Sequence, residues 1–197
     1  SGVVDESTPG GYTLIYSVTD TAGNIATENR IVTVLEGETF GDAVVYSNNS
    51  ATLIASVSIN GEVSGDGDVL ATYVGDGLRQ KTSVNVNGGK AWVLSLVNAK
   101  GGNEAISFKV FDARTGVTFE RSKFSSELTA SLIMSTGSSL GTYASPVEIK
   151  MDSVAPVLTI LGQSEVRIDQ GLTYTDDGAS AVDHVDGYIT SNMVKTG

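Results

Sequence analysis

The sequence predicts an all-β protein made of two β-sandwich units. Short runs of β-branched and aromatic residues recur along its 197 residues, and clusters of Gly, Asn and Asp separate these runs. The 23 glycines and 3 prolines suit tight turns between strands. A hydrophobic fraction of 40% and a charged fraction of 18% are typical of a folded chain. We expect one complete central sandwich and a second unit whose two halves lie at opposite ends of the chain.

Residues 1–35 are expected to form a β-hairpin, the second half of the divided unit. Residues 11–18 alternate apolar and polar side chains, as a half-buried strand does. Gly23 and Asn24 stand where the turn needs positive φ, and residues 25–34 return as the second strand.

Residues 36–151 are expected to form the complete central sandwich. About seven strand-like runs follow one another at spacings of about ten residues, a pattern typical of sandwiches and barrels. The turn Asn87-Gly-Gly89 between two apolar runs is a strong hairpin signal. Residues 125–134 are the one stretch where a short helix, capped by Ser125 or Ser126, competes with a strand. The clearest strand runs are residues 51–59, 69–74, 78–86, 91–97, 104–111 and 117–120.

Residues 152–197 are expected to form the first half of the divided unit. Residues 152–156 (Asp-Ser-Val-Ala-Pro) join them to the central sandwich, and the proline makes this joint stiffer than a Gly/Ser linker. The stretches 156–162, 174–179 and 183–190 predict the opening strands of a small sandwich.

The two ends of the chain carry an ordered series of short sequence motifs. They are Ala155-Pro156-Val157, Leu161-Gly162, Tyr174 through Ala179, Asp183, Asp186-Gly187, Ile189-Thr190, Thr8 through Tyr12, Tyr16, Asp20 through Asn24, and Arg30. Taken with residues 152–197 before residues 1–34, this series resembles one bacterial Ig-like repeat of the hyalin-repeat and pesticidal-crystal-protein types. The resemblance implies an Ig-like domain split across the two termini of a bacterial extracellular or cell-surface protein.

Each half has an apolar face and unpaired strand edges, so each needs a complement. The halves can close within one chain, pair head to tail between copies of the chain, or join adjoining repeats of one long chain. Closure within the chain is demanding, because Ig-like domains carry their termini at opposite poles. We therefore favour a linear assembly whose partners are other copies or adjoining repeats. Because the chain begins inside a domain, we expect it to be a piece of something longer.

The charge of the chain excludes one class of partner. The formal net charge is −11, and no part of the sequence is basic, whereas nucleic-acid binding needs clustered Lys and Arg. The absence of cysteine rules out disulfides and zinc–thiolate sites. No apolar run of about 18 residues occurs, so we expect no membrane insertion.

Calcium is the one cofactor that the sequence suggests. Hard cations prefer several carboxylate and carbonyl oxygens, often from loops at domain junctions, and the resemblance to extracellular Ig-like arrays implies calcium at their joints. The candidate ligands are Asp20, Asp152, Asp176, Asp177, Asp183 and Asp186. The alternative is that these are solvated turn residues. Glu62 with Asp66-Gly-Asp68 is a weaker second candidate.

We expect no enzymatic activity. The sequence lacks Gly-x-Ser-x-Gly, His-Glu-x-x-His and phosphate-loop motifs. His184, the one histidine, is expected in an exposed turn, and turn composition explains Asp66 and Asp68 better than acid–base hydrolysis does. Trp92 lies in an apolar run and is expected in the core rather than as a platform for a sugar.

The sequence therefore favours a structural repeat or subunit of a bacterial surface protein or filament, linked head to tail through complementation of the split Ig-like domain. The alternative is an adhesin or carbohydrate-binding module whose central domain recognises a glycan or a host surface.

Overall fold

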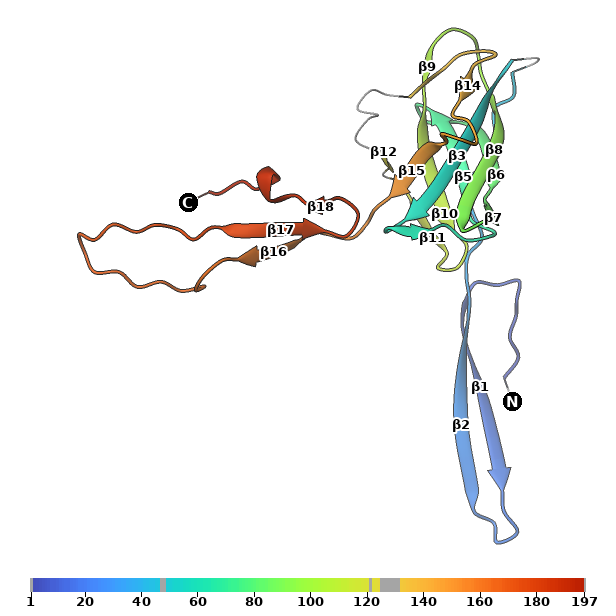
Figure 1. The fold of residues 1–197 in the computed structure, drawn as a ribbon. Helices are drawn as coiled ribbons and strands as arrows, with labels where there is room; N and C mark the ends of the chain where they lie inside the picture. Colours follow the sequence, from blue (N-terminus) through green and yellow to red (C-terminus); the bar gives the residue numbers. More distant parts are fainter. Residues whose placement is uncertain (1, 47–48, 121, 125–131, 197) are drawn as a thin grey trace.

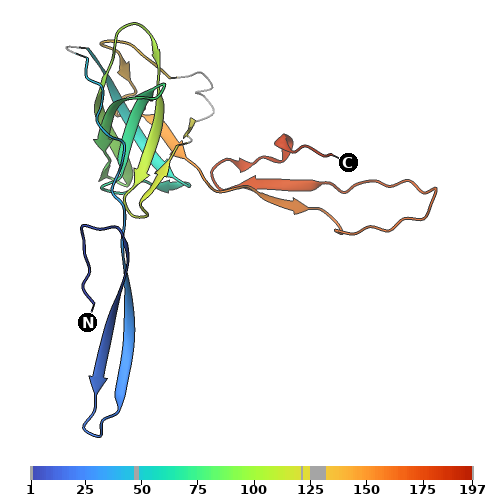
Figure 2. The same ribbon diagram turned by 180° about the vertical axis from the view of Figure 1, so that it is seen from behind.

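The computed structural model describes residues 2–46, 49–120, 122–124 and 132–196. It consists of a central β-sandwich from which two thin β-structures project in different directions (Figure 1). We call residues 2–34 the N-arm and residues 157–196 the C-arm. The view from behind shows both arms standing clear of the central sandwich over most of their length (Figure 2). The all-β prediction is confirmed.

The larger central sheet has seven strands and is centred on β3 (Ser50–Ile59). β3 pairs antiparallel with β8 (Lys90–Asn98) and parallel with β15 (Val147–Met151). The remaining strands of this sheet are β4 (Glu62–Val63), β7 (Asn85–Asn87), β12 (Ser122–Phe124) and β14 (Ser139–Leu140).

The second central sheet has four strands in the order β11, β10, β5 and β6. Their bounds are β5 (Val69–Val74), β6 (Gly77–Ser83), β10 (Ser107–Asp112) and β11 (Val117–Phe119). The prediction of a single strand over residues 78–86 is wrong at its end. The chain leaves this sheet at the buried Val84 and enters the other sheet as β7.

A small sheet closes one end of the sandwich. It pairs β9 (Glu104–Ala105) with β13 (Ile133–Met134). Residues 125–131 of the stretch that was open to helix or strand lie outside the described residues, and its end is the strand β13.

The hydrophobic core lies between the two central sheets. Along β3, alternate residues from Ala51 to Ile59 are buried, as the two-residue period of a strand requires. Leu53 of β3, Phe108 of β10 and Ile149 of β15 are each at most 2% exposed and belong to one cluster. The residues of this cluster all belong to the central sandwich.

The N-arm is a two-stranded hairpin of β1 (Gly10–Thr19) and β2 (Ile25–Val34) in continuous antiparallel register. The hairpin prediction is confirmed. Gly23 has φ +89°, as the turn requires, but Asn24 does not share this conformation. The amide group of Asn24 instead donates a hydrogen bond to Asp20 Oδ2 at 2.7 Å.

The C-arm is a three-stranded sheet followed by one turn of 3₁₀ helix. Its strands are β16 (Val157–Ile160), β17 (Ala179–Asp183) and β18 (Gly187–Tyr188), and the 3₁₀ turn is η1 (Thr190–Asn192). A loop of residues 161–178 connects β16 to β17. The sheets of the two arms are separate, so within residues 2–34 and 157–196 the two arms are not paired with each other.

Candidate functional site: the uncovered faces of the two arms

The N-arm presents an apolar face to solvent. The two-residue period places Tyr12, Leu14, Tyr16 and Val18 on the same face of β1. Tyr16 is 51% exposed and Val18 is 67% exposed, although both belong to residue types that normally pack in a core. The guanidinium of Arg30 lies 5.8 Å from the centre of the Tyr16 ring and is the one cation over this face that the described contacts record.

The C-arm also presents apolar side chains without a cover. Leu158 and Ile160 share a face of β16 and are 63% and 58% exposed. On the opposite face, Val157 is 66% exposed. β16 is the terminal strand of its sheet, so one of its two edges has no strand partner. Exposed apolar residues beside an open strand edge are typical of a surface that pairs with another chain segment.

Neither arm has a core of its own. Among the described residues, Ala181 is the one buried apolar residue outside the central sandwich. Most of the large apolar side chains that the structure leaves exposed belong to the two arms. Two- and three-stranded sheets of this size are marginal in water without further packing. In the described residues, each arm is therefore a thin sheet without a packed core of its own.

The turn of the N-arm is held by the carboxylate of Asp20. Its Oδ1 accepts hydrogen bonds from the backbone N–H groups of Ala22 and Asn24, at 2.9 and 2.8 Å. The hydrogen bond from the Asn24 side chain, with the backbone bonds, lowers the pKa of Asp20. The carboxylate is thereby committed to closing the hairpin.

The joint between the central sandwich and the C-arm is tied by hydrogen bonds and close packing. Ser153 donates its backbone N–H to Asn60 Oδ1 at 2.9 Å. Asn60 has φ +50° and Gly61 has φ +80°, and together they form the two-residue turn between β3 and β4. The ring of His184 lies against Gly61, where an added Cβ would be 2.9 Å from His184 Nε2. His184 is exposed in the β17–β18 turn, as the sequence predicts, and its ring also lies at the joint.

The C-arm carries two further ordered acidic residues. Lys195 Nζ forms an ion pair with Asp176 Oδ2 at 2.7 Å, and the hydrogen bond from Lys195 lowers the pKa of Asp176. Asp183 is 4% exposed, and its Oδ1 accepts the backbone N–H groups of Val185 and Asp186 at 2.8 Å each. These bonds shape the β17–β18 turn.

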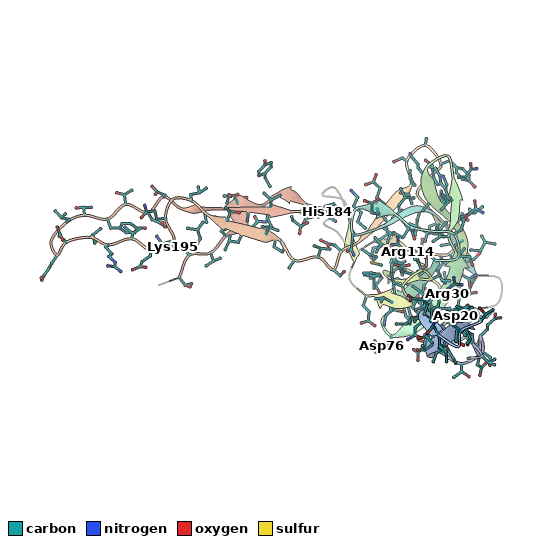
Figure 3. All side chains as sticks on the ribbon, turned by 90° about the horizontal axis from the view of Figure 1, so that it is seen from below. Asp20, Arg30, Asp76, Arg114, His184 and Lys195 are labelled. Atoms are coloured by element: carbon teal, nitrogen blue, oxygen red, sulfur yellow. The ribbon has the colours of Figure 1, made fainter. Side chains whose placement is uncertain are left out.

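The predicted calcium ligands are spread over the molecule. Asp20 lies in the N-arm, away from the C-arm residues His184 and Lys195 (Figure 3). Asp152 is at the start of the joint, where its Oδ1 accepts the Val154 N–H at 2.9 Å. Within the described ranges, no three His, Cys, Asp or Glu side chains are grouped so as to hold a metal ion. Calcium binding by Asp20, Asp152, Asp176, Asp177, Asp183 and Asp186 stays a prediction.

The second acidic candidate has an internal role. Asp68 is 3% exposed, and its carboxylate accepts bonds from Ser64 Oγ and from the backbone N–H groups of Gly65 and Ala113. Asp66 Oδ1 accepts the Val86 N–H at 2.8 Å. These carboxylates connect loops of the sandwich.

The expectation that Trp92 lies in the core is wrong. Trp92 alternates with the buried Ala91 and Val93 along β8, so its side chain lies on the outer face of the seven-stranded sheet. There its ring contacts Tyr143, with 5.8 Å between the ring centres. The run 91–97 has apolar residues at both parities, so its pattern could not show which face is buried.

The comparison with known families bears on the N-arm. Residues 1–34 match the family model of the bacterial surface protein Ig-like domain. This match supports an Ig-like surface module and a surface or extracellular location. The match does not extend to residues 152–197, so the splitting of one Ig-like domain across both termini belongs to the proposal below. No curated protein and no solved structure matches the chain. In the part of the chain that the structure describes, no helix is long and apolar enough to cross a membrane.

Proposed function

We propose that the chain is a non-catalytic structural module of a bacterial surface protein or filament. Successive modules link head to tail when the N-arm of one module completes the Ig-like domain begun by the C-arm of the module before it. The observation that carries this proposal is the absence of a core in both arms beside a central sandwich that has one. A neighbouring module supplies the missing cover.

The size of the uncovered apolar surface supports this pairing. Each arm offers several half-exposed aliphatic and aromatic side chains. Burial of ~1,000 Å² of apolar surface at one joint stabilises it by on the order of 25 kcal/mol before the entropy of ordering is subtracted.

The direction of the arms favours an open chain of modules. The arms leave the central sandwich in different directions and form separate sheets (Figure 1). A contact between two different surfaces of identical modules is heterologous and propagates unless its rotation closes a ring. Adjoining repeats of one polypeptide and separate copies would use the same joint.

Two charge substitutions test the joint. Val18→Asp places a carboxylate on the apolar face of the N-arm, and Leu158→Asp does so on β16 of the C-arm. Ser17→Asp is the matched control for the first, because Ser17 is exposed on the opposite face of β1. We expect multi-angle light scattering to show rods or higher oligomers for the parent chain and for Ser17→Asp. Each of the other two variants should be a 20.4 kDa monomer.

A mixing experiment separates head-to-tail pairing from other association. The Val18→Asp chain keeps an intact C-arm, and the Leu158→Asp chain keeps an intact N-arm. An equimolar mixture should therefore form heterodimers and nothing larger. The intact C-arm of one variant can pair with the intact N-arm of the other, and no second intact pair of arms remains. A parent chain that is a monomer with a single cooperative melt, or variants that assemble like the parent, would overturn the proposal.

A further inference from the structure

An aromatic pair lies on the outer face of the central sandwich, outside the surfaces used by the proposed joint. Trp92 of β8 and Tyr143 of the loop after β14 have ring centres 5.8 Å apart and planes inclined by 56°. Tyr143 is 63% exposed. The Trp92 indole N–H donates to the carbonyl oxygen of Asn87 at 3.3 Å, which fixes the ring on the β7–β8 hairpin.

The two rings are part of the lining of an open groove of about 700 Å³. Its other lining residues include the polar residues Thr82, Ser83, Asn85, Asn87 and Lys90. The Thr82 hydroxyl is hydrogen-bonded to Ser95 Oγ at 2.7 Å. The groove therefore combines a rigid aromatic floor with neutral hydrogen-bonding groups that both donate and accept. This composition is typical of a site that orients a ligand with few polar contacts over an apolar base.

The face of Trp92 already attracts positive charge. Lys90 Nζ lies 5.6 Å from the ring centre, in the position that the negative ring face favours. The C–H groups on one face of a pyranose ring carry small positive partial charges and make the same contact. Lys90 has a flexible stem, so it can move aside for a ligand and donate to one of its oxygens.

We propose that this groove binds a carbohydrate chain. One pyranose ring stacks on Trp92 and Tyr143, and the amides of Asn85 and Asn87 exchange hydrogen bonds with its hydroxyl groups. The open shape suits an internal segment of a polysaccharide. With a net charge of −11 and one lysine in the groove, a polyphosphate ligand is disfavoured.

Fluorescence tests this proposal directly, because Trp92 is the one tryptophan of the chain. The full chain is titrated with hexasaccharides of glucose, mannose, galactose and N-acetylglucosamine. We expect a saturable change in Trp92 emission with at least one sugar. Tyr143→Ala should weaken that binding about tenfold, because one of the two stacking rings is lost.

The control is Tyr188→Ala, which removes an aromatic ring that is 87% exposed on the C-arm and should leave sugar affinity unchanged. Titration calorimetry with Trp92→Ala gives a second measurement of sugar affinity. A thermal melt shows that the variant is folded. The proposal is overturned if no sugar gives a saturable change, or if Tyr143→Ala binds like the parent. A change in emission that follows protein concentration without sugar would also overturn it, because a second copy would then be the occupant. The sugar titration and the Tyr143→Ala comparison do not depend on the joint between the arms.

Discussion

Replacement of Asp68 should destabilise the central sandwich more than replacement of any exposed aspartate. Asp68 Oδ2 accepts hydrogen bonds from Ser64 Oγ at 2.5 Å and from the Gly65 N–H at 2.7 Å. Its Oδ1 accepts the Ala113 N–H at 2.9 Å, across 45 positions of sequence. The carboxylate thus fastens the loop before β5 to the turn that follows β10.

The size of the effect follows from these three bonds. A hydrogen bond to a charged group contributes about 1.5–3 kcal/mol, and a buried donor left without a partner costs about 1–3 kcal/mol. Asp68→Ala removes all three bonds and leaves two backbone donors without a partner. Three bonds at the lower limit sum to about 4.5 kcal/mol, so we expect the free energy of unfolding to fall by at least about 4.5 kcal/mol. Asp68→Asn keeps one carbonyl oxygen but points an NH₂ group at N–H or O–H donors, and should cost about 2 kcal/mol.

Urea unfolding followed by Trp92 emission measures this loss, because Trp92 lies in the central sandwich and reports on neither arm. The midpoint should fall while the slope stays constant. Asp76→Asn is the control. Asp76 lies exposed in the turn between β5 and β6, and its replacement should change stability by less than about 0.5 kcal/mol. If Asp68→Asn unfolded at the same urea concentration as this control, the bonding pattern described for Asp68 would be wrong.

Three further predictions concern the buried ion pair of Arg79 and Glu104, the joint and calcium. Burial alone would raise the pKa of Glu104, but hydrogen bonds from the Lys100 N–H and the Arg79 guanidinium lower it below its ordinary value. Its contribution to stability is therefore present above about pH 4.5 and lost as the pH falls through the lowered pKa. Glu104→Gln should cost about 3 kcal/mol at pH 7 in urea unfolding, and a difference that did not shrink towards pH 3 would contradict this assignment. Gly61→Ala should lower the melting temperature, because Gly61 has positive φ and contacts His184; an unchanged melt would show that the turn relaxes freely. If calcium binds, EDTA should lower the melting temperature of the assembled chain, and an equal melt with and without EDTA would remove the metal prediction.

Much of the strand pattern was predictable because it depends on neighbours in the sequence. The alternation in β1 and β3, and the Asn-Gly and Asn-Gly-Gly turns that follow β3 and β7, act over a few residues. The parallel pairing of β3 with β15 joins segments about ninety residues apart, so no local pattern specifies it. The shift of the chain at Val84 from one sheet to the other also depends on this distant packing.

The candidate sites were less predictable for the same reason. Asp68 has the sequence context of an ordinary turn residue, and its distant partner at Ala113 makes it a buried one. The sequence could assign Trp92 to the outer face only if the two faces of β8 differed in polarity. They do not, because the outer face also carries Leu94 and Leu96, which are 56% and 62% exposed. His184 acquires its contact with Gly61 from the path of the linker, which the sequence describes only as stiff.

The structure of the joint bears on what an assembly of these modules would look like. The bond from Ser153 to Asn60 and the packing of His184 on Gly61 hold the start of the C-arm against the β3–β4 turn. If the C-arm then completes an Ig-like domain with the next N-arm, that domain is set at a defined angle to the central sandwich that carries the C-arm, because these contacts hold the C-arm side of the joint. A string of such modules would behave as a rod with a fixed repeat. Loosening this contact with Gly61→Ala should broaden the distribution of angles between modules in electron micrographs while leaving the pairing of the arms intact. A broken rod in that variant would instead mean that the joint itself, and not only its angle, depends on the β3–β4 turn.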